Sequence, residues 1–266
     1  MLESNCSLSE VEKKIFERTI SECKDKFIEV STGMLLELVI YSATHGNALG
    51  QKQMGDFYSN KIEGVIQQNL AEAKKWYMLA ARQGNISALK HLLNFHLNGQ
   101  LPFDEIDVII RKFQTNESTD CELHFLLGKV YHKMQMYEPA FKYIKISAKN
   151  NNREAVMFLA DLYFTGCGSV DPDPQKTLKL LNDLKDANYI PALCKLGQLY
   201  ESGFDGQDKK PNKAYKLYKE AADKGHEDAI RKIKELDKIP KKAKRKKRHD
   251  KEDFFDGDGK YLIDIQ

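Results

Sequence analysis

The chain has 266 residues, of which 41% are hydrophobic and 10% aromatic, and its formal net charge is +3. This composition excludes a largely disordered chain, and the longest apolar stretch, residues 34–41, is far shorter than the roughly 20 residues of a membrane-spanning helix. Five cysteines without a C-x-x-C pair argue against a disulfide framework or a zinc site, and they favour a reducing cytosol.

The amino-terminal segment, residues 1–32, is predicted to form a capping helix. Its start lacks the basic segment and the apolar run of a secretory signal. Ser9 and Glu12 have the spacing of a capping box, and the apolar residues that follow lie on one helical face: Val11, Ile15, Cys23, Phe27 and Val30. We therefore expect this helix to cover the exposed end of the helices that come after it.

Between residues 33 and 237, one residue spacing returns six times. Its clearest copy reads Ala214, Leu217-Tyr218, Ala221-Ala222, Gly225-His226 and Ala229, and the least regular copy lies between residues 108 and 123. The closing residues give a period of 32 to 38 residues: Gly50, Ala88, Leu123, Ala155, Ala192 and Ala229. Self-similarity at this period predicts an all-α fold, an α/α solenoid of about five to six tandem helix-turn-helix repeats.

The offsets within each copy explain why it forms a helix pair. They place the recurring side chains on one helical face, and the small residues at the seventh and eighth offsets allow a neighbouring helix to approach closely. A Gly or Asn at the eleventh offset can adopt the left-handed conformation that ends a helix. Pro139, Pro174 and Pro211 are expected one to three residues before a helix begins. A second signature, a small residue with a tyrosine three positions later, predicts a close helix crossing at Gly55–Tyr58, Gly128–Tyr131, Ala160–Tyr163 and Gly197–Tyr200.

These motifs resemble the Sel1-like repeat family, a relative of the tetratricopeptide repeats. The resemblance is carried by Gly197-x-x-Tyr200-x-x-Gly203 followed by Lys213-Ala214, Tyr218 and Ala221-Ala222-x-x-Gly225, and residues 55–88 repeat this pattern. It extends over residues 35–236, although residues 92–118 lack the loop glycines and the paired alanines. The resemblance implies a non-enzymatic scaffold or adaptor for protein–protein interaction. Members of the family act in signalling, in protein quality control, and in bacterial secretion or host interaction.

By analogy with tetratricopeptide geometry, the helices that carry the second signature are expected to line a groove. Lysines beside apolar side chains suit an extended peptide of a partner protein that carries acids and one or two apolar anchors. The alternative is a merely solvated face. The predicted groove residues are Lys52, Asp56, Asn60, Lys90, Asn94, Phe125, Lys129, His132, Lys133, Met157, Asp161, Gln198 and Glu201.

Residues 238–266 are predicted to form a flexible tail, basic at first and then acidic. The basic run consists of Lys241, Lys242, Lys244, Arg245, Lys246, Lys247 and Arg248. It is a candidate nuclear import signal in a eukaryotic cell, or a site that binds nucleic acid or acidic lipid through phosphate contacts. The runner-up function is therefore a nuclear or nucleic-acid-associated factor, and a solubilising tail is a third explanation.

No constellation of residues predicts catalysis, a metal site or a cofactor. Gly128-Lys129 lacks the upstream glycine of a phosphate-binding loop, and His91 and His96 are five residues apart, which does not suit a shared metal ion. Cys167, between two glycines, is either an exposed reactive thiol or an ordinary loop residue. We therefore expect a protein that is not an enzyme and resides in the cytoplasm, with the nucleus as the alternative.

Overall fold

A computed structural model of the chain describes residues 32–60, 67–114, 120–168, 170–204 and 208–238, without the side chains of residues 32–36, 114 and 238. The predicted capping helix and the predicted tail, with its basic run, lie outside these residues. The described residues form twelve helices and no strand beyond one isolated bridge between Cys167 and Val170. The predicted all-α fold is confirmed.

The helices alternate between two kinds, which we name by their place in the repeat. The first helices carry the small-residue and tyrosine signature or its counterpart: α3 (Ala48–Ser59), α5 (Ile86–Leu97), α7 (Cys121–Lys133), α9 (Arg153–Thr165), α11 (Ile190–Ser202) and α13 (Glu227–Lys238). The second helices carry the paired small residues or their replacements: α2 (Thr32–Thr44), α4 (Leu70–Arg82), α6 (Asp104–Gln114), α8 (Tyr137–Lys149), α10 (Pro174–Asp186) and α12 (Pro211–Asp223).

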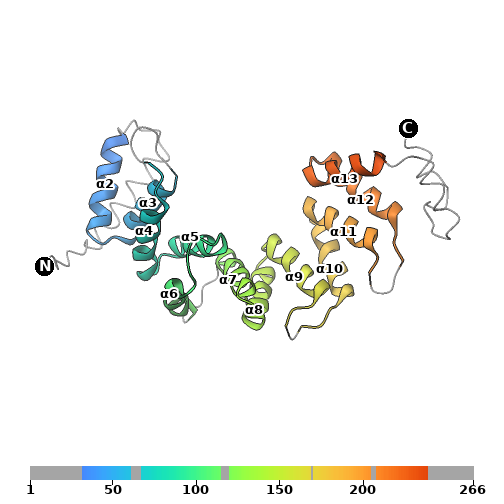
Figure 1. The fold of residues 1–266 in the computed structure, drawn as a ribbon, viewed down its shortest axis with the longest axis horizontal. Helices are drawn as coiled ribbons and strands as arrows, with labels where there is room; N and C mark the ends of the chain where they lie inside the picture. The colour runs from blue at the N-terminus through green and yellow to red at the C-terminus, as the bar shows by residue number, and fades with distance from the viewer. Residues whose placement is uncertain (1–31, 61–66, 115–119, 169, 205–207, 239–266) are drawn as a thin grey trace. The chain divides into compact units, whose positions relative to one another are not determined.

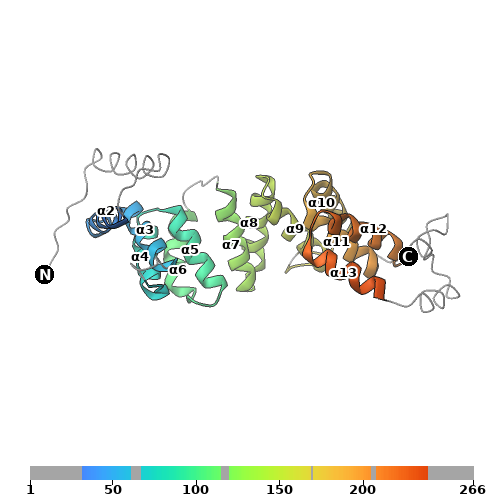
Figure 2. The same cartoon turned by 90° about the horizontal axis from the view of Figure 1, so that it is seen from above.

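The chain divides into two compact units, an N-terminal unit, Met1–Lys133, and a C-terminal unit, Met134–Gln266. Within the N-terminal unit, α2 to α5 each pack against the next helix, and α7 packs against α5 (Figures 1 and 2). Within the C-terminal unit, each helix from α8 to α13 packs against its sequence neighbours. None of the described helices is both long enough and apolar enough to cross a lipid bilayer.

A dipeptide ends most second helices and starts the first helix that follows. Gly46, Gly84, Asn151, Asn188 and Gly225 all have left-handed backbone angles, with φ between 56° and 97°, as the spacing predicts. After Gly46, Gly84 and Asn151, the next residue is an asparagine whose side chain caps the new helix, whereas Tyr189 makes no such hydrogen bond. For example, Oδ1 of Asn85 accepts a hydrogen bond from the Ala88 N–H at 2.9 Å. At α3, α5 and α9, two adjacent residues therefore end one helix and start the next.

The close crossings predicted at Gly55 and Gly197 are present. A Cβ atom on Gly55 would lie 2.5 Å from the Tyr77 ring of α4, and one on Gly197 would lie 2.7 Å from the Tyr218 ring of α12. Both rings are buried in the core. In the repeat formed by α9 and α10, Ala160 replaces the glycine and Leu181 replaces the tyrosine. The smaller leucine leaves room for the alanine methyl group.

Two details of the predicted elements need correction. Pro174 and Pro211 are the first residues of α10 and α12, and Pro139 is the third residue of α8, rather than preceding these helices. This is tolerated because the N–H groups of the first turn have no intrahelical partner. In the irregular repeat, Val108 is 75% exposed while Ile106 is fully buried, so the repeat begins at Ile106 rather than near Val108.

The Gly197 crossing predicts a stability effect that depends on its partner. Gly197→Ala should lower the free energy of unfolding by about 1–3 kcal/mol, because the added methyl group overlaps the Tyr218 ring. The same substitution in a Tyr218→Leu background should cost much less, since that pair copies Ala160 and Leu181. Chemical denaturation of the four proteins tests this, and equal costs in both backgrounds would contradict the crossing.

Candidate functional site

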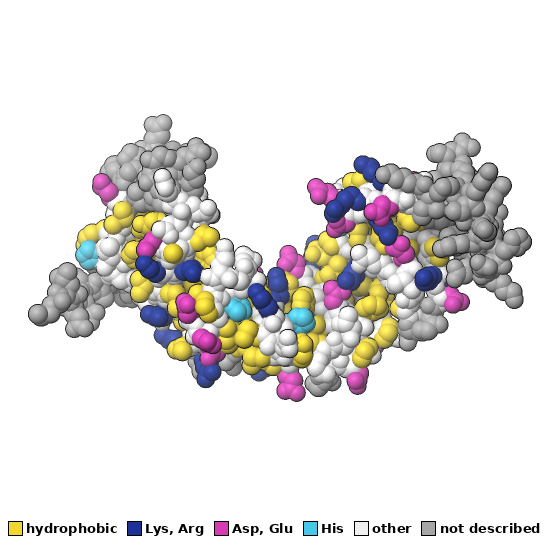
Figure 3. Space-filling model, viewed as in Figure 1, with side chains coloured by type: hydrophobic (Ala, Val, Ile, Leu, Met, Phe, Trp, Pro, Cys, Tyr) yellow, Lys and Arg dark blue, Asp and Glu magenta, His cyan; other side chains and the backbone are white. Residues whose placement is uncertain are grey.

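The predicted groove residues lie on first helices, and each unit carries its own set. Those from Lys52 to Lys133 lie on or next to α3, α5 and α7 of the N-terminal unit, and those from Met157 to Glu201 lie on α9 and α11 of the C-terminal unit. We name the surface made by these side chains in each unit the first-helix face. In Figure 3, acidic and basic side chains lie beside one another over α13, whose Lys232 joins this face in the C-terminal unit.

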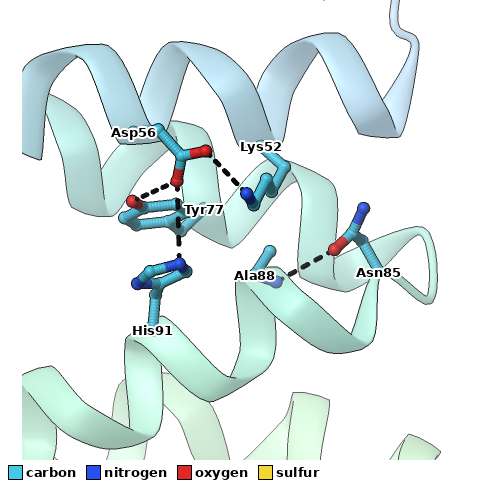
Figure 4. A network of polar contacts seen from close by, with 6 residues as sticks. All are labelled: Lys52, Asp56, Tyr77, Asn85, Ala88 and His91. Carbon is cyan, nitrogen blue, oxygen red and sulfur yellow. Dashed lines mark hydrogen bonds and ion pairs between the residues drawn. The ribbon is translucent and has the colours of Figure 1, made fainter. Parts of the chain in front are cut away.

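Asp56 is the centre of a polar network that joins three consecutive helices (Figure 4). On its own helix, Nζ of Lys52 lies 2.6 Å from its Oδ2. The Tyr77 hydroxyl of α4 donates to its Oδ1 at 2.9 Å, and Nε2 of His91 on α5 lies 3.6 Å from the same oxygen. The His91 ring also stacks on the Tyr77 ring, with centroids 4.5 Å apart. The carboxylate of α3 thus connects its own repeat to the next one.

Burial and the charge of Asp56 determine the protonation states of Tyr77 and His91 in this network. Burial, together with the Asp56 charge and hydrogen bond, raises the pKa of Tyr77, so the phenol remains a donor. Burial lowers the pKa of His91, although the Asp56 charge opposes the change. His91 is therefore neutral at neutral pH, and its contact with Asp56 becomes an ion pair only on acidification.

Lys90 forms a second polar link, from α5 to the start of α7. Its Nζ lies 2.8 Å from Asp120 Oδ2 and 2.5 Å from Glu122 Oε2, and its side chain is only 18% exposed. Burial alone would disfavour its charge, but hydrogen bonds to the two carboxylates outweigh burial and raise the pKa of Lys90. Asp120 also accepts a hydrogen bond from the Leu123 N–H at 2.8 Å. Lys90 is therefore held in place rather than free in solvent.

The remaining groove residues of the N-terminal unit differ in exposure. Phe125 is 7% exposed, so its ring offers little surface to a partner, and Nζ of Lys129 lies 5.4 Å from the ring centroid. Nζ of Lys133 donates to the carbonyl oxygens of His96 and Leu97 at the end of α5, at 3.1 Å and 2.8 Å. His132 is half-buried, whereas Asn60 and Asn94 are exposed. Most of the lysines expected to attract an acidic peptide are thus engaged within the fold.

The C-terminal unit repeats the same arrangement. Oδ1 of Asp161 lies 2.7 Å from Nζ of Lys195, and these residues occupy the same places in the repeat as Asp56 and His91. Oε1 of Glu201 lies 3.0 Å from Nζ of Lys232, and its Oε2 accepts a hydrogen bond from the Tyr218 hydroxyl at 2.9 Å. Met157 is half-buried against the core, and Gln198 is exposed. In both units an acid of one first helix therefore contacts a base of the next.

Sequence reasoning missed the partners in these networks: Tyr77, His91, Asp120, Glu122, Lys195, Tyr218 and Lys232. Equivalent positions in the repeats could have indicated some of these partners. Asp56 and Asp161 each follow the small residue of the signature, and His91 and Lys195 each stand three residues after a closing alanine. Alignment of the repeats would therefore have placed each acid opposite a base of the next repeat.

Two buried cysteines of the described residues, Cys167 and Cys194, lack the features of reactive thiols. Cys167 is 8% exposed, and burial raises its pKa, so of the two alternatives for this residue the structure supports an ordinary loop residue rather than an exposed reactive thiol. Sγ of Cys194 lies 3.3 Å from Nδ1 of His226, but burial raises the pKa of Cys194 to about 11, which keeps it a thiol near neutral pH. Among the described residues, no three His, Cys, Asp or Glu side chains gather in a way that could hold a metal ion.

Comparison with known families explains these regularities. Residues 48–85, 153–182 and 190–226 match the family model of the Sel1 repeat. The chain carries Sel1 repeats. Each Sel1 match begins in a first helix and runs into or through the second helix that follows it, α3 with α4, α9 with α10, and α11 with α12. The unmatched middle includes α6, where the buried Ile106 and Phe113 stand in place of the small residues of the other copies.

Solved structures show the same fold. The c5321 protein, described as a protective antigen of uropathogenic Escherichia coli with an SLR fold, is 21% identical, with a TM-score of 0.64 over 84% of this chain and 49% of that one. This chain thus spans about half the length of that protein. A Sel1 repeat protein from Oxalobacter formigenes is 23% identical, with a TM-score of 0.60 over 80% and 88% of the two chains. No curated protein sequence matched.

The lowered pKa of His91 predicts a pH effect on stability. Between the folded and unfolded pKa values the unfolded chain binds more protons, so this residue's contribution is present above the unfolded value, near 6.5, and is lost as the pH falls through the folded value. His91→Gln should therefore reduce the loss of unfolding free energy between about pH 7.5 and pH 5. Denaturant titrations at both pH values measure this loss. An unchanged loss in the variant would show that His91 is not responsible.

Proposed function

We propose that this Sel1 repeat protein is a non-enzymatic interaction scaffold that binds a partner protein along its first-helix face. Sel1 repeat proteins are generally protein-interaction scaffolds and generally non-catalytic. The observation that carries the proposal is the contact between an acid of one first helix and a base of the next, Asp56 with the neutral His91 and Asp161 with Lys195. Each pair fixes polar side chains at a surface that the fold does not cover.

Fixed side chains favour binding because their conformational entropy is already lost when the partner arrives. The side chains of Lys52 and Asp56 are 24% and 25% exposed, so each keeps one side toward solvent while the other contacts the protein. A partner that meets these groups orders few additional side chains. The same charges on unpaired, mobile side chains would offer weaker and less specific contacts.

The pairing also narrows the kind of ligand. Lys52 and Lys90 already contact carboxylates, so an acidic peptide would have to compete with Asp56, Asp120 and Glu122 for them. Exposed amide side chains are better suited to bind a partner. An amide both donates and accepts hydrogen bonds, so it can bond to the backbone of an extended segment. Such amides lie at Asn60, Asn94 and Gln198. We infer that the partner presents an extended polar segment rather than a strongly acidic one.

Site-specific photocrosslinking tests which face binds. A photoreactive side chain at position 94, on the first-helix face, should capture the partner in cells that express the full chain. The matched control is position 75, an exposed lysine position on the second helix α4 of the same unit. Capture at position 75 without capture at position 94 would show that the partner contacts the second helices, and this result would reject the proposal.

A binding measurement with the captured partner should follow the same pattern. Asn94→Trp should weaken binding by about tenfold or more, because a bulky ring blocks a central position of the face. Lys75→Trp should bind as the unchanged protein does. Circular dichroism should show equal helix content in both variants, since both positions are exposed. Equal affinities for the two variants would contradict the proposed face.

A further inference from the structure

Four of the six exposed large apolar side chains in the described part of the chain lie on second helices of the N-terminal unit: Ile40 and Tyr41 on α2, Leu79 on α4 and Val108 on α6. They are between 40% and 75% exposed. Tyr41 and Leu79 occupy the same place in the repeat, six residues after its first position, and Val108 stands one helical turn before that place. They therefore lie on the side of each helix that faces away from the core. We name these four residues the apolar stripe.

The repeat itself does not require apolar side chains at these places. In α10 and α12 of the C-terminal unit, the residues equivalent to Leu79 are Asp183 and Glu220. Burial of an apolar side chain stabilises a fold, whereas these side chains remain largely in solvent. Contiguous apolar surface of this kind on a protein marks a site of interaction.

The apolar surface continues from α2 to α4, because these helices lie side by side with their last turns together. Nε2 of Gln51 on α3 donates to the Ala43 carbonyl oxygen of α2 at 3.4 Å, and Oε1 of Gln51 accepts from Nε2 of Gln83, the residue after α4, at 2.7 Å. Trp76, one turn before Leu79, packs against the apolar cluster that contains Ala43.

α6 lies next to α4 and runs in the same direction. Nζ of Lys74, in the first half of α4, donates to the carbonyl oxygen of Gln100, just ahead of α6, at 3.0 Å. Nζ of Lys112, near the end of α6, donates to the carbonyl oxygen of Arg82, the last residue of α4, at 2.9 Å. The starts of the three second helices therefore share one side of the apolar stripe, and their ends share the other side.

The two sides of the apolar stripe carry opposite charges. One turn from the stripe, the exposed charges are acids on the side of the helix starts and bases on the side of the helix ends: Glu37, Asp104 and Glu105, and Arg82, Arg111 and Lys112. Lys75 is the exception, and its Nζ lies 2.6 Å from Oε1 of Glu72. Acids near the start of a helix and bases near its end stabilise that helix, but the apolar side chains between them have no such effect.

We propose that the apolar stripe is a second interaction surface, which binds an amphipathic helix of a partner protein. Such a helix has an apolar face between two polar edges. It can therefore cover the stripe while bases along one edge meet the acidic side and acids along the other edge meet the basic side. An extended segment fits less well, because its backbone needs a strand edge to pair with, and the three second helices offer none.

Fluorescence anisotropy with the full chain tests this surface. The probe is a labelled helical peptide with leucines on one face, arginines along one edge of that face and glutamates along the other. The comparison peptide has the same composition, with arginines and glutamates mixed along both edges. The test variant combines Tyr41→Gln, Leu79→Gln and Val108→Gln. The matched control combines Met134→Gln and Met136→Gln, which remove exposed apolar side chains outside the stripe.

We expect the sorted peptide to bind more tightly than the mixed one, and the stripe variant to bind it about tenfold more weakly than the control variant. Val108→Gln alone should already weaken binding, and it should leave the helix content unchanged because Val108 is so exposed. Asn94→Trp should leave this binding unchanged, which separates it from the proposed first-helix function. Equal affinities for the two peptides, or equal losses in the stripe and control variants, would overturn the proposal.

Two further results would assign the stripe to a different occupant and would also overturn the proposal. The first is a dimer of the full chain, seen by sedimentation, that the stripe variant dissociates, because the occupant is then a second copy. The second is tighter peptide binding by a full-chain variant with Val11→Gln, Ile15→Gln and Phe27→Gln, because residues 1–31 then compete for the stripe.

Discussion

At Gly55 and Gly197, a first helix lies so close to a tyrosine of the following second helix that a methyl group would overlap the ring. This approach buries the aromatic ring and leaves its hydroxyl at the edge of the core. A buried hydroxyl requires a hydrogen-bond partner, and Asp56 or Glu201 of the first helix supplies one. The contact that holds two helices together therefore also fixes a carboxylate at the first-helix face.

That carboxylate connects one repeat to the next. Asp56 reaches His91 and Glu201 reaches Lys232, and in each case the base lies on the following first helix. A Sel1 repeat in this chain is thus joined to its neighbour by apolar packing and by a polar contact on the exposed side. Because these polar contacts lie on the face that we propose binds a partner, the spacing of its polar groups follows from the spacing of the repeats.

Much of the fold could be predicted from the sequence, because helix periodicity and small residues determine which faces pack. The turn residues Gly84 and Asn151 and the crossing at Gly197 are local consequences of their own side chains. The candidate site was predictable only in part. Periodicity places Lys52 beside Asp56, one turn along the same helix, but it does not reveal Asp120, which reaches Lys90 from the start of another helix. The burial of Phe125 could not be predicted either, since it depends on neighbours outside its own helix.

The link between packing and the first-helix face can be measured directly with a double-mutant cycle on Tyr77→Phe and Asp56→Asn. Phenylalanine keeps the ring at the Gly55 crossing and removes only the hydroxyl that donates to Asp56. If this hydrogen bond to a charged group joins the core to the face, the two changes should show a coupling of about 1–2 kcal/mol in the free energy of unfolding. Effects that add to within about 0.5 kcal/mol would contradict it.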